Sequence, residues 1–219
     1  MNKAIKYGIV GFKGRMGKEI INAMNEEGHK LVFGYDLNER FEQDKPEVIF
    51  DFSLPSALEA TLSFALKYNS KLAIGTTGYT ADEKNKIISV SDTIAVLYST
   101  NFSVGVYALK EILKVAKKIM SDWDCEVVEL HHKKKKDKPS GTAKSLLEIL
   151  GEDKLSHSLR IGGVVGEHSV YFANSGDLIE IRHSAISRRT FAEGARLAAK
   201  FLLDKQRGYY TFEDIFKEK

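Results

Sequence analysis

The first half of the chain alternates short apolar runs with segments whose apolar residues recur every three or four positions. Short apolar runs predict strands buried on both faces, whereas the recurring pattern predicts helices with one buried face. Because the two alternate, this half predicts βαβ units and an α/β fold with a Rossmann-like, doubly wound parallel sheet. The expected strands are 5–10, 31–35, 48–52, 72–74 and 94–97, and the expected helices include 18–27 and 56–68.

The pattern changes after Phe102, where a long amphipathic helix, three strands and a final helix are expected. Two of these strands flank Asn174-Ser175-Gly176-Asp177, which is a strong hairpin signal. This half therefore predicts an α+β domain with an open antiparallel or mixed sheet and helices on one side. Pattern alone assigns the final helix to neither half. The expected ranges are 106–120 for the long helix, 126–130, 164–173 and 178–183 for the strands, 191–203 for the final helix and 209–216 for the tail.

Composition and charge exclude several classes of protein. With 219 residues, 43% of them hydrophobic and 29% charged, the chain is typical of a soluble globular protein with one large or two small domains. The net charge of +3 is too small to indicate nucleic acid as a partner. The single cysteine, Cys125, provides neither a disulfide framework nor a zinc cluster, and we expect it to be buried. We expect no signal peptide and no membrane span, and therefore a cytoplasmic protein.

A glycine-rich segment, GFKGRMG at 11–17, follows the first strand and opens the first helix. Glycines let the backbone turn tightly and approach a pyrophosphate, whose charge then meets the N–H groups at the helix amino end. The spacing is not the commoner G-x-G-x-x-G, so a plain glycine-rich turn is the alternative. Asp36 ends the second strand, 36 − 11 = 25 residues after Gly11, where an acid accepts hydrogen bonds from a ribose diol. Later polar turns at 51–53, 75–78 and 99–102 would converge on the same edge of the sheet.

The segment 129–142 is the most informative part of the chain. A strand ends in His131 and His132, a basic loop follows, and Pro139 leads into a helix that begins Ser140-Gly141-Thr142. The N–H groups and hydroxyls at such a helix amino end form a cradle for a carboxylate. A lysine beside it would add positive charge, and a histidine in the same pocket suits proton delivery.

Simpler interpretations apply to parts of this segment. Four consecutive lysines, 133–136, usually form a solvated loop, and we expect most of these to do so. Adjacent histidines on a strand point to opposite faces, so we expect no metal site. A nucleic-acid interface would need a broader basic surface with exposed aromatic residues, which the nearby acids Glu129 and Asp137 disfavour.

With these motifs assembled, the chain resembles the 4-hydroxy-tetrahydrodipicolinate reductase family almost from end to end. The signature His-His-x-x-Lys-x-Asp-x-Pro-Ser-Gly-Thr-Ala at 131–143 is highly specific for it. The further matching segments are 11–17, 51–55, 75–78, 101–106, 166–168 and 187–191. Two departures are a chain shortened around 34–46 and 151–157, and Leu37 after Asp36, where members that favour NADPH often carry a basic residue.

The resemblance implies roles for individual residues. It makes His131 the general acid and Lys135 the catalytic lysine, and it gives His132, Ser140, Gly141 and Thr142 contacts with a substrate carboxylate. It also implies two domains, with 1–102 and 189–219 binding the dinucleotide and 103–188 binding substrate and forming the oligomer. The implied cofactor-binding residues are Gly11, Lys13, Gly14, Arg15, Met16, Asp36, Phe52, Gly75, Thr76, Thr77, Thr100, Asn101, Phe102, Arg188 and Phe191.

The implied reaction is hydride transfer from NADH or NADPH to carbon 4 of a small cyclic dicarboxylate, with loss of the 4-hydroxyl as water. It belongs to lysine biosynthesis through diaminopimelate, and family members are typically homotetramers. We expect both cofactors to work, with NADH modestly preferred, because Asp36 would repel the extra phosphate of NADPH. Two alternatives stay open: a dehydrogenase of a different hydroxy or amino acid, which would turn over those acids, and a dinucleotide sensor, which would bind cofactor without turnover.

Overall fold

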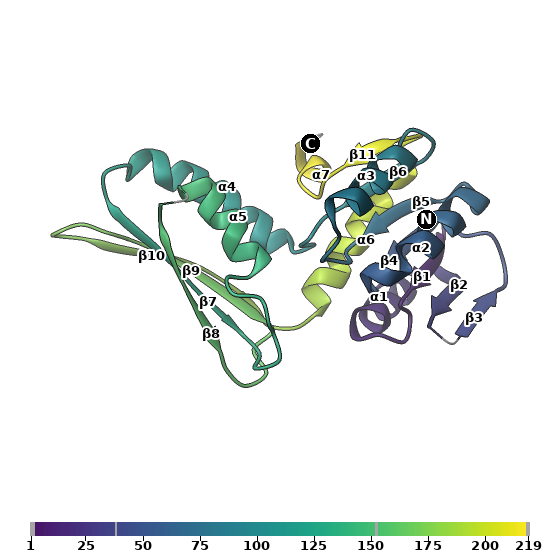
Figure 1. Ribbon diagram of the computed structural model, residues 1–219, viewed down its shortest axis with the longest axis horizontal. Coiled ribbons are helices and arrows are strands. Elements are labelled where there is room, and N and C mark those ends of the chain that lie inside the picture. Colours follow the sequence, from purple (N-terminus) through teal and green to yellow (C-terminus); the bar gives the residue numbers. More distant parts are fainter. Residues whose placement is uncertain (1–2, 38, 152, 218–219) are drawn as a thin grey trace. The chain divides into compact units, whose positions relative to one another are not determined.

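The computed structural model describes residues 3–37, 39–151 and 153–217. The chain divides into two compact units: unit 1 comprises Met1–Phe102 and Phe191–Lys219, and unit 2 comprises Ser103–Thr190. Unit 1 is therefore discontinuous in sequence, with unit 2 inserted into it. Figure 1 shows both units in the colours of the sequence.

Unit 1 is built on a seven-stranded sheet with the order β11-β6-β5-β4-β1-β2-β3. Every pair of neighbours is parallel except β2 and β3. The direction of strand addition reverses at β1, which lies between β2 and β4, as in doubly wound sheets. The strands are β1 (Lys6–Val10), β2 (Lys30–Asp36), β3 (Glu39–Glu42), β4 (Val48–Asp51), β5 (Lys71–Ile74), β6 (Ala95–Tyr98) and β11 (Gly208–Tyr210).

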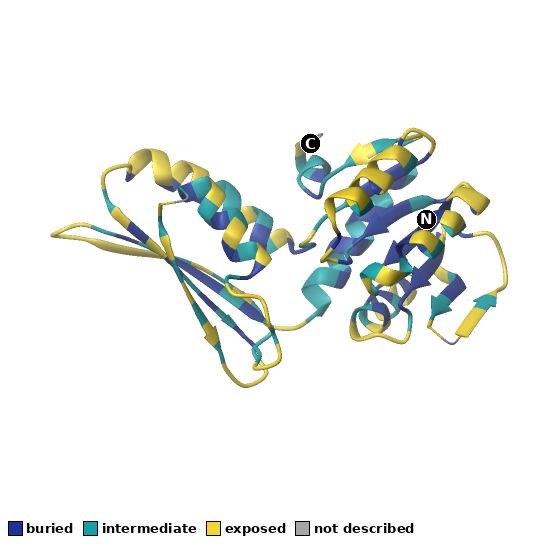
Figure 2. Ribbon diagram, viewed as in Figure 1, coloured by how far each residue is buried: buried dark blue, intermediate teal, exposed yellow. Residues whose placement is uncertain are grey.

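Helices cover both faces of this sheet (Figure 1). On one face Leu58, Leu62 and Ala65 of α2 pack with Ile87 of α3 against strand residues that include Ile49. On the other face α1 lies against the sheet, where the Tyr7 hydroxyl of β1 donates to Asn25. The central strands are buried on both faces, which explains their continuous apolar sequences (Figure 2). The helices are α1 (Arg15–Glu26), α2 (Leu58–Tyr68), preceded by the 3₁₀ turn η1 (Pro55–Ala57), α3 (Ala81–Val90), α6 (Arg189–Leu203) and α7 (Asp214–Lys217).

Unit 2 contains a four-stranded sheet with the order β10-β9-β7-β8. The sheet is mixed, because β7 and β8 are parallel and the other pairs are antiparallel. Two helices pack on one face, where Leu113 and Leu146 join Val127 and Phe172 in a second core. The elements are α4 (Val104–Ile119), β7 (Asp124–His131), α5 (Gly141–Leu150), β8 (Leu155–Arg160), β9 (Gly166–Ala173) and β10 (Leu178–Ala185).

The predicted fold class is confirmed by the parallel sheet of unit 1 and the mixed sheet of unit 2. Cys125 is buried, as expected. The elements β3, β8, β11, α3 and α7 were not predicted, since 209–216 was expected only as a tail. Neither β3 nor β8 has an apolar run. β3 forms a hairpin with the preceding strand β2, whereas the position of β8 depends on pairing with β7, which is distant in sequence. Within the described ranges, no helix combines the length and the apolar character that a membrane span requires.

Candidate functional site

The glycine-rich segment forms a tight turn between β1 and α1. Gly11 has a φ of +85°, and its N–H donates to the carbonyl of Tyr35 at 2.8 Å. A Cβ on Gly17 would lie 2.3 Å from the Gly11 carbonyl oxygen, so only glycine fits there. The helix starts at Arg15, three residues before the predicted start at 18. Its N-cap is Gly14, so no side chain caps it.

Asp36 lies at the carboxyl end of β2, beside this turn. Its two oxygens accept hydrogen bonds from the backbone N–H groups of Lys13 (3.1 Å) and Leu37 (2.9 Å). The carboxylate is thereby fixed against the glycine-rich turn. The Lys13 ammonium forms an ion pair with Glu39 of the neighbouring strand.

Arg40 of β3, a second cation close to Asp36 in sequence, has other partners. Its guanidinium bonds to Glu42 at 2.6 Å and lies 4.8 Å from the centre of the Phe64 ring. Lys13 and Arg40 are thus each engaged by a carboxylate of β3. An uncapped helix amino end, glycines that leave the backbone open and a fixed carboxylate together fit a dinucleotide.

The turns after β4 and β5 are joined by the buried carboxylate of Asp51. It accepts hydrogen bonds from the hydroxyls of Ser53 (2.5 Å), Thr76 (2.7 Å) and Thr61 (2.8 Å). Burial raises the pKa of Asp51, and these donors oppose the rise. The Thr76 hydroxyl is therefore used within the protein, whereas Thr77 is exposed. The turns lie close together because β1, β4 and β5 end at the same level of the sheet: Asp51 is paired with both Val10 and Ile74.

Aromatic rings link the same turns. A Cβ on Gly75 would lie 2.2 Å from the Phe52 ring, and one on Gly11 would lie 2.8 Å from the Phe52 carbonyl. The Phe52 and Phe102 rings are 5.1 Å apart, and Phe102 is buried in unit 1. The structure thus brings together Gly11, Phe52, Gly75 and Phe102. Of the other predicted cofactor residues, Lys13, Gly14, Arg15 and Thr100 are exposed, while Met16, Asn101, Arg188 and Phe191 are partly buried. Arg188 directly precedes α6, and Phe191 lies in its first turn.

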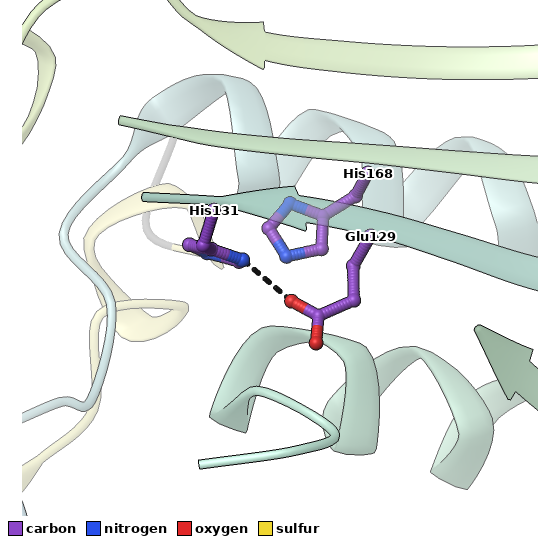
Figure 3. Close-up of side chains that lie close together, drawn as sticks. All are labelled: Glu129, His131 and His168. Carbon is purple, nitrogen blue, oxygen red and sulfur yellow. Dashed lines mark ion pairs between the residues drawn. The ribbon is translucent and has the colours of Figure 1, made fainter. Parts of the chain in front are cut away.

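Unit 2 holds a second group of polar residues, centred on Glu129 of β7. Glu129 and His131 are two residues apart on the strand, so their side chains share a face (Figure 3). The Glu129 side chain is completely buried, and its Oε2 lies 2.5 Å from Nδ1 of His131. Oε1 accepts hydrogen bonds from the Ser158 hydroxyl (2.6 Å), Arg160 Nη2 (2.7 Å) and the backbone N–H of Ser140 (3.1 Å).

The amino end of α5 begins at this carboxylate. Ser140 is the N-cap, and its hydroxyl accepts a hydrogen bond from the N–H of Ala143 at 3.1 Å. The same hydroxyl lies 3.3 Å from Nε2 of His168 on β9. A Cβ on Gly141 would meet nothing within 4 Å, so the first turn of the helix is open to a ligand there. The predicted Ser140–Thr142 cradle therefore lies next to His131, with Glu129 between them.

Burial and charge determine the protonation of this group. Burial would raise the pKa of Glu129, but bonds from Arg160, Ser158 and Ser140 outweigh it and lower the value to about 2. Burial lowers the pKa of His131, which the charge of Glu129 partly offsets. Burial, assisted by His131, lowers the pKa of His168 to about 3. At neutral pH the group is thus an ionised carboxylate beside a guanidinium, with a neutral His168.

Glu129, His131 and His168 also meet the spacing of a metal site, because one ligand atom from each lies within 4.8 Å of the others. However, Arg160 already bonds to the same carboxylate and is itself only 7% exposed. A divalent cation would therefore meet a fixed positive charge. The absence of a metal stays a prediction.

Lys135 differs from the other lysines of the basic loop 133–136 in its exposure and in its partner. Lys135 is 24% exposed and its Nζ lies 2.9 Å from Asp137, whereas the other three lysines of 133–136 are exposed. The backbone N–H of Lys135 donates to the carbonyl of His132, which folds the loop back toward β7. Lys135 is near enough to His131 to lower its pKa.

Four residues of this group had been given no role from sequence: Glu129, Ser158, Arg160 and His168. The i, i+2 spacing of Glu129 and His131 on a predicted strand was an available signal. Arg160 and His168 gave no such signal, because β8 and β9 reach Glu129 only through strand pairing.

Comparison with known proteins identifies the family. The models for the N-terminal and C-terminal parts of dihydrodipicolinate reductase match residues 5–102 and 105–216. The 4-hydroxy-tetrahydrodipicolinate reductase of Thermosipho africanus is 52% identical over 214 residues, covering 98% of this chain and 99% of that protein. The enzyme of the same name from Campylobacter lari is 38% identical over 96% of this chain and 98% of that protein.

A solved structure agrees in fold. The dipicolinate-bound dihydrodipicolinate reductase of Paenisporosarcina sp. TG-14 superposes with a TM-score of 0.78 at 21% identity, covering 95% of this chain and 98% of that one. The resemblance inferred from the sequence motifs is confirmed: the chain belongs to the dihydrodipicolinate reductase family of oxidoreductases.

Proposed function

We propose that the chain reduces 4-hydroxy-tetrahydrodipicolinate to tetrahydrodipicolinate, with loss of the 4-hydroxyl as water, on the diaminopimelate route to lysine. The observation that carries this proposal is the 52% identity to a reductase of that name over 98% of the chain. The substrate is a small dicarboxylate, for which unit 2 offers a helix amino end and a basic loop.

Unit 1, with the dinucleotide domain taken as 1–102 and 189–219, binds the cofactor in this proposal. The amino end of α1 receives the pyrophosphate and Asp36 receives the adenosine ribose. NADH is modestly preferred, because Lys13 and Arg40 are paired with Glu39 and Glu42 rather than available to a phosphate. Specificity constants for NADH and NADPH at one ionic strength test this preference. A preference for NADPH of about tenfold or more, about 1.4 kcal/mol, contradicts it.

Unit 2, taken as 103–188, supplies the groups that act on the substrate. The reduced nicotinamide supplies the hydride when it is bound. His131 donates the proton to the carbon next to the reduced one, directly or through water. Lys135, His132 and the amino end of α5 at 140–142 hold a carboxylate and stabilise charge as it shifts.

The test is oxidation of NADH by the purified protein with substrate made freshly from pyruvate and aspartate semialdehyde. We expect turnover in the wild type and a loss of about a hundredfold in His131→Ala, the usual scale for general acid catalysis. Affinity for NADH should be unchanged in that variant. Near-normal turnover would remove His131 from the mechanism, and turnover with hydroxy or amino acids instead would favour a different dehydrogenase.

The proposal extends to assembly and location. Leu155, Leu159 and Leu178 are 61%, 46% and 68% exposed, and strand alternation places them on the face of the sheet opposite α4 and α5. These exposed leucines would be buried between copies in a homotetramer formed through unit 2. Light scattering after size-exclusion chromatography tests this assembly.

The proposed location is the cytoplasm, because reduced nicotinamide is supplied there. Fractionation of cells tests it.

A further inference from the structure

The buried carboxylate of Glu129 contacts both the proposed proton donor, His131, and the amino end of α5. Glu129 receives its partners from segments far apart in the sequence: His131 on its own strand, Ser140 at the start of α5 and Arg160 on β8. The carboxylate is fully buried, so no water replaces a lost partner. A buried carboxylate lowers the stability of the fold unless it is paired and hydrogen-bonded, and an apolar residue would avoid that cost. The contacts of Glu129 therefore indicate a role other than packing.

We propose that Glu129 is a positioning residue, which holds the imidazole of His131 through one oxygen and the amino end of α5 through the other, with Arg160 as its counter-ion. This inference rests on the proposed function, because it assigns to Glu129 the control of the proton donor in that reaction.

The first step concerns the tautomer of His131. Because Oε2 of Glu129 lies 2.5 Å from Nδ1, the proton of the neutral imidazole is expected on Nδ1. Nε2 is then the atom that gains and delivers a proton. It lies on the side of Gly166, where an added Cβ would approach it to 3.1 Å. Glycine at this position leaves room beside that nitrogen.

The second step concerns charge. The charged and titratable groups that face His131 are Glu129 on its own strand, Lys135 from the basic loop, Arg160 from β8 and His168 from β9. Glu129 is the only anion among these facing groups. Without it, burial and two cations would lower the pKa of His131 further. The protonated form that a general acid requires would then be scarcer at neutral pH.

The third step concerns the substrate cradle. Oε1 of Glu129 accepts the N–H of Ser140, the residue that caps α5. A displacement of this carboxylate would move the helix amino end and the imidazole together. Glu129 thus keeps the proton donor in a fixed relation to the groups that would hold the substrate carboxylate.

Glu129→Gln is the informative variant, because it keeps the size of the side chain and an oxygen for Ser140, Ser158 and Arg160. The amide presents an N–H₂ donor to Nδ1 and carries no charge. Glu126→Gln is the matched control. Glu126 lies on the same strand and pairs with His157 at 2.8 Å, but both side chains are about half exposed.

The experiment measures kcat and KM against pH with NADH for the wild type, Glu129→Gln, Glu129→Asp and Glu126→Gln. We expect Glu129→Gln to lose on the order of a hundredfold in kcat, with a smaller change in KM. Because a general acid loses activity as pH rises through its pKa, the fall in kcat at high pH should begin at lower pH in this variant. Glu129→Asp, which keeps the charge, should restore the profile in part, and Glu126→Gln should match the wild type.

Nitrogen NMR of histidine-labelled protein gives a second readout that needs no turnover. In the wild type the neutral His131 ring should be protonated at Nδ1, and in Glu129→Gln at Nε2. A wild-type ring protonated at Nε2 overturns the proposal even if the variant fails to fold. An unchanged pH profile in folded Glu129→Gln, or an equal shift in Glu126→Gln, also overturns it. If the wild type lacks reductase activity, the proposed function fails, while the NMR result still decides the role of Glu129.

Discussion

Replacing Arg160 by methionine removes the counter-ion of Glu129 while keeping much of the length of the side chain. Arg160 is 7% exposed and bonds to Glu129 at 2.7 Å and to the carbonyl of Asp137 at 2.5 Å. The carboxylate is left in the interior with Ser158, Ser140 and the neutral ring of His131 as its partners, and no cation bonded to it. Breaking a buried ion pair on one side is strongly destabilising for this reason.

The size of the loss follows from the pKa of Glu129, which is about 2 instead of 4.5. At about 1.4 kcal/mol per pKa unit, the bound state of this carboxylate contributes about 3 kcal/mol near neutral pH. Arg160 provides the largest part of it. We therefore expect Arg160→Met to lower the free energy of unfolding of unit 2 by about 3 kcal/mol.

Urea unfolding followed by tryptophan fluorescence measures this loss. The only tryptophan of the chain, Trp123, lies in unit 2 and packs against its core, so the signal reports that unit. With a typical slope of about 2 kcal/mol per molar urea, the midpoint should fall by about 1.5 M. The control is Arg182→Met, which breaks a pair with Glu167 in which Arg182 is 54% exposed. Its cost should be below about 1 kcal/mol.

Two further results are expected from the same variant. Adding Glu129→Gln should recover most of the loss, because no charge is then left unpaired. The stability contributed by a carboxylate with a lowered pKa is present above pH 4.5 and lost as the pH falls toward 2, so the difference between wild type and variant should shrink in acid. Equal midpoint shifts for Arg160→Met and Arg182→Met would refute the reasoning.

Three other predictions concern single residues. Lys135→Ala should lower both kcat and substrate affinity, whereas Lys134→Ala, at an exposed position, should do little; steady-state kinetics would contradict this if both variants behaved alike. Gly17→Ala should abolish NADH binding in fluorescence titrations, since its Cβ would lie 2.3 Å from the Gly11 carbonyl; normal affinity would show that the turn can shift. His168, whose pKa falls from 6.5 to about 3, binds its proton more readily when unfolded, so stability should decline by up to about 1.4 kcal/mol per pH unit below 6.5. His168→Phe should weaken that decline in urea titrations, and an unchanged slope would exclude His168 as its source.

Features set by local sequence could be predicted, and features set by distant pairing could not. The glycine turn, Asp36 and the capped start of α5 each follow from a few adjacent residues, and all were predicted. The helix α3 also carries a local signal in its sequence, the capping box of Thr80 and Glu83. The contact of Arg160 with Glu129 could not be predicted. The guanidinium reaches Glu129 only because β8 pairs with β7, and β8 has no apolar run from which a strand could be predicted.

The discontinuity of unit 1 determines the order in which the chain can fold during synthesis. Domains usually fold as they emerge, from the N-terminus onward. Here residues up to Phe102 lack the strand β11, which pairs with β6, and the helix α6, whose Gly194 lies against the Phe102 backbone so closely that a Cβ would come within 1.6 Å of its carbonyl oxygen. Unit 2, at 103–190, is complete on the ribosome before the last strand of unit 1 has been made. The nucleotide-binding half of the chain begins first and is finished last.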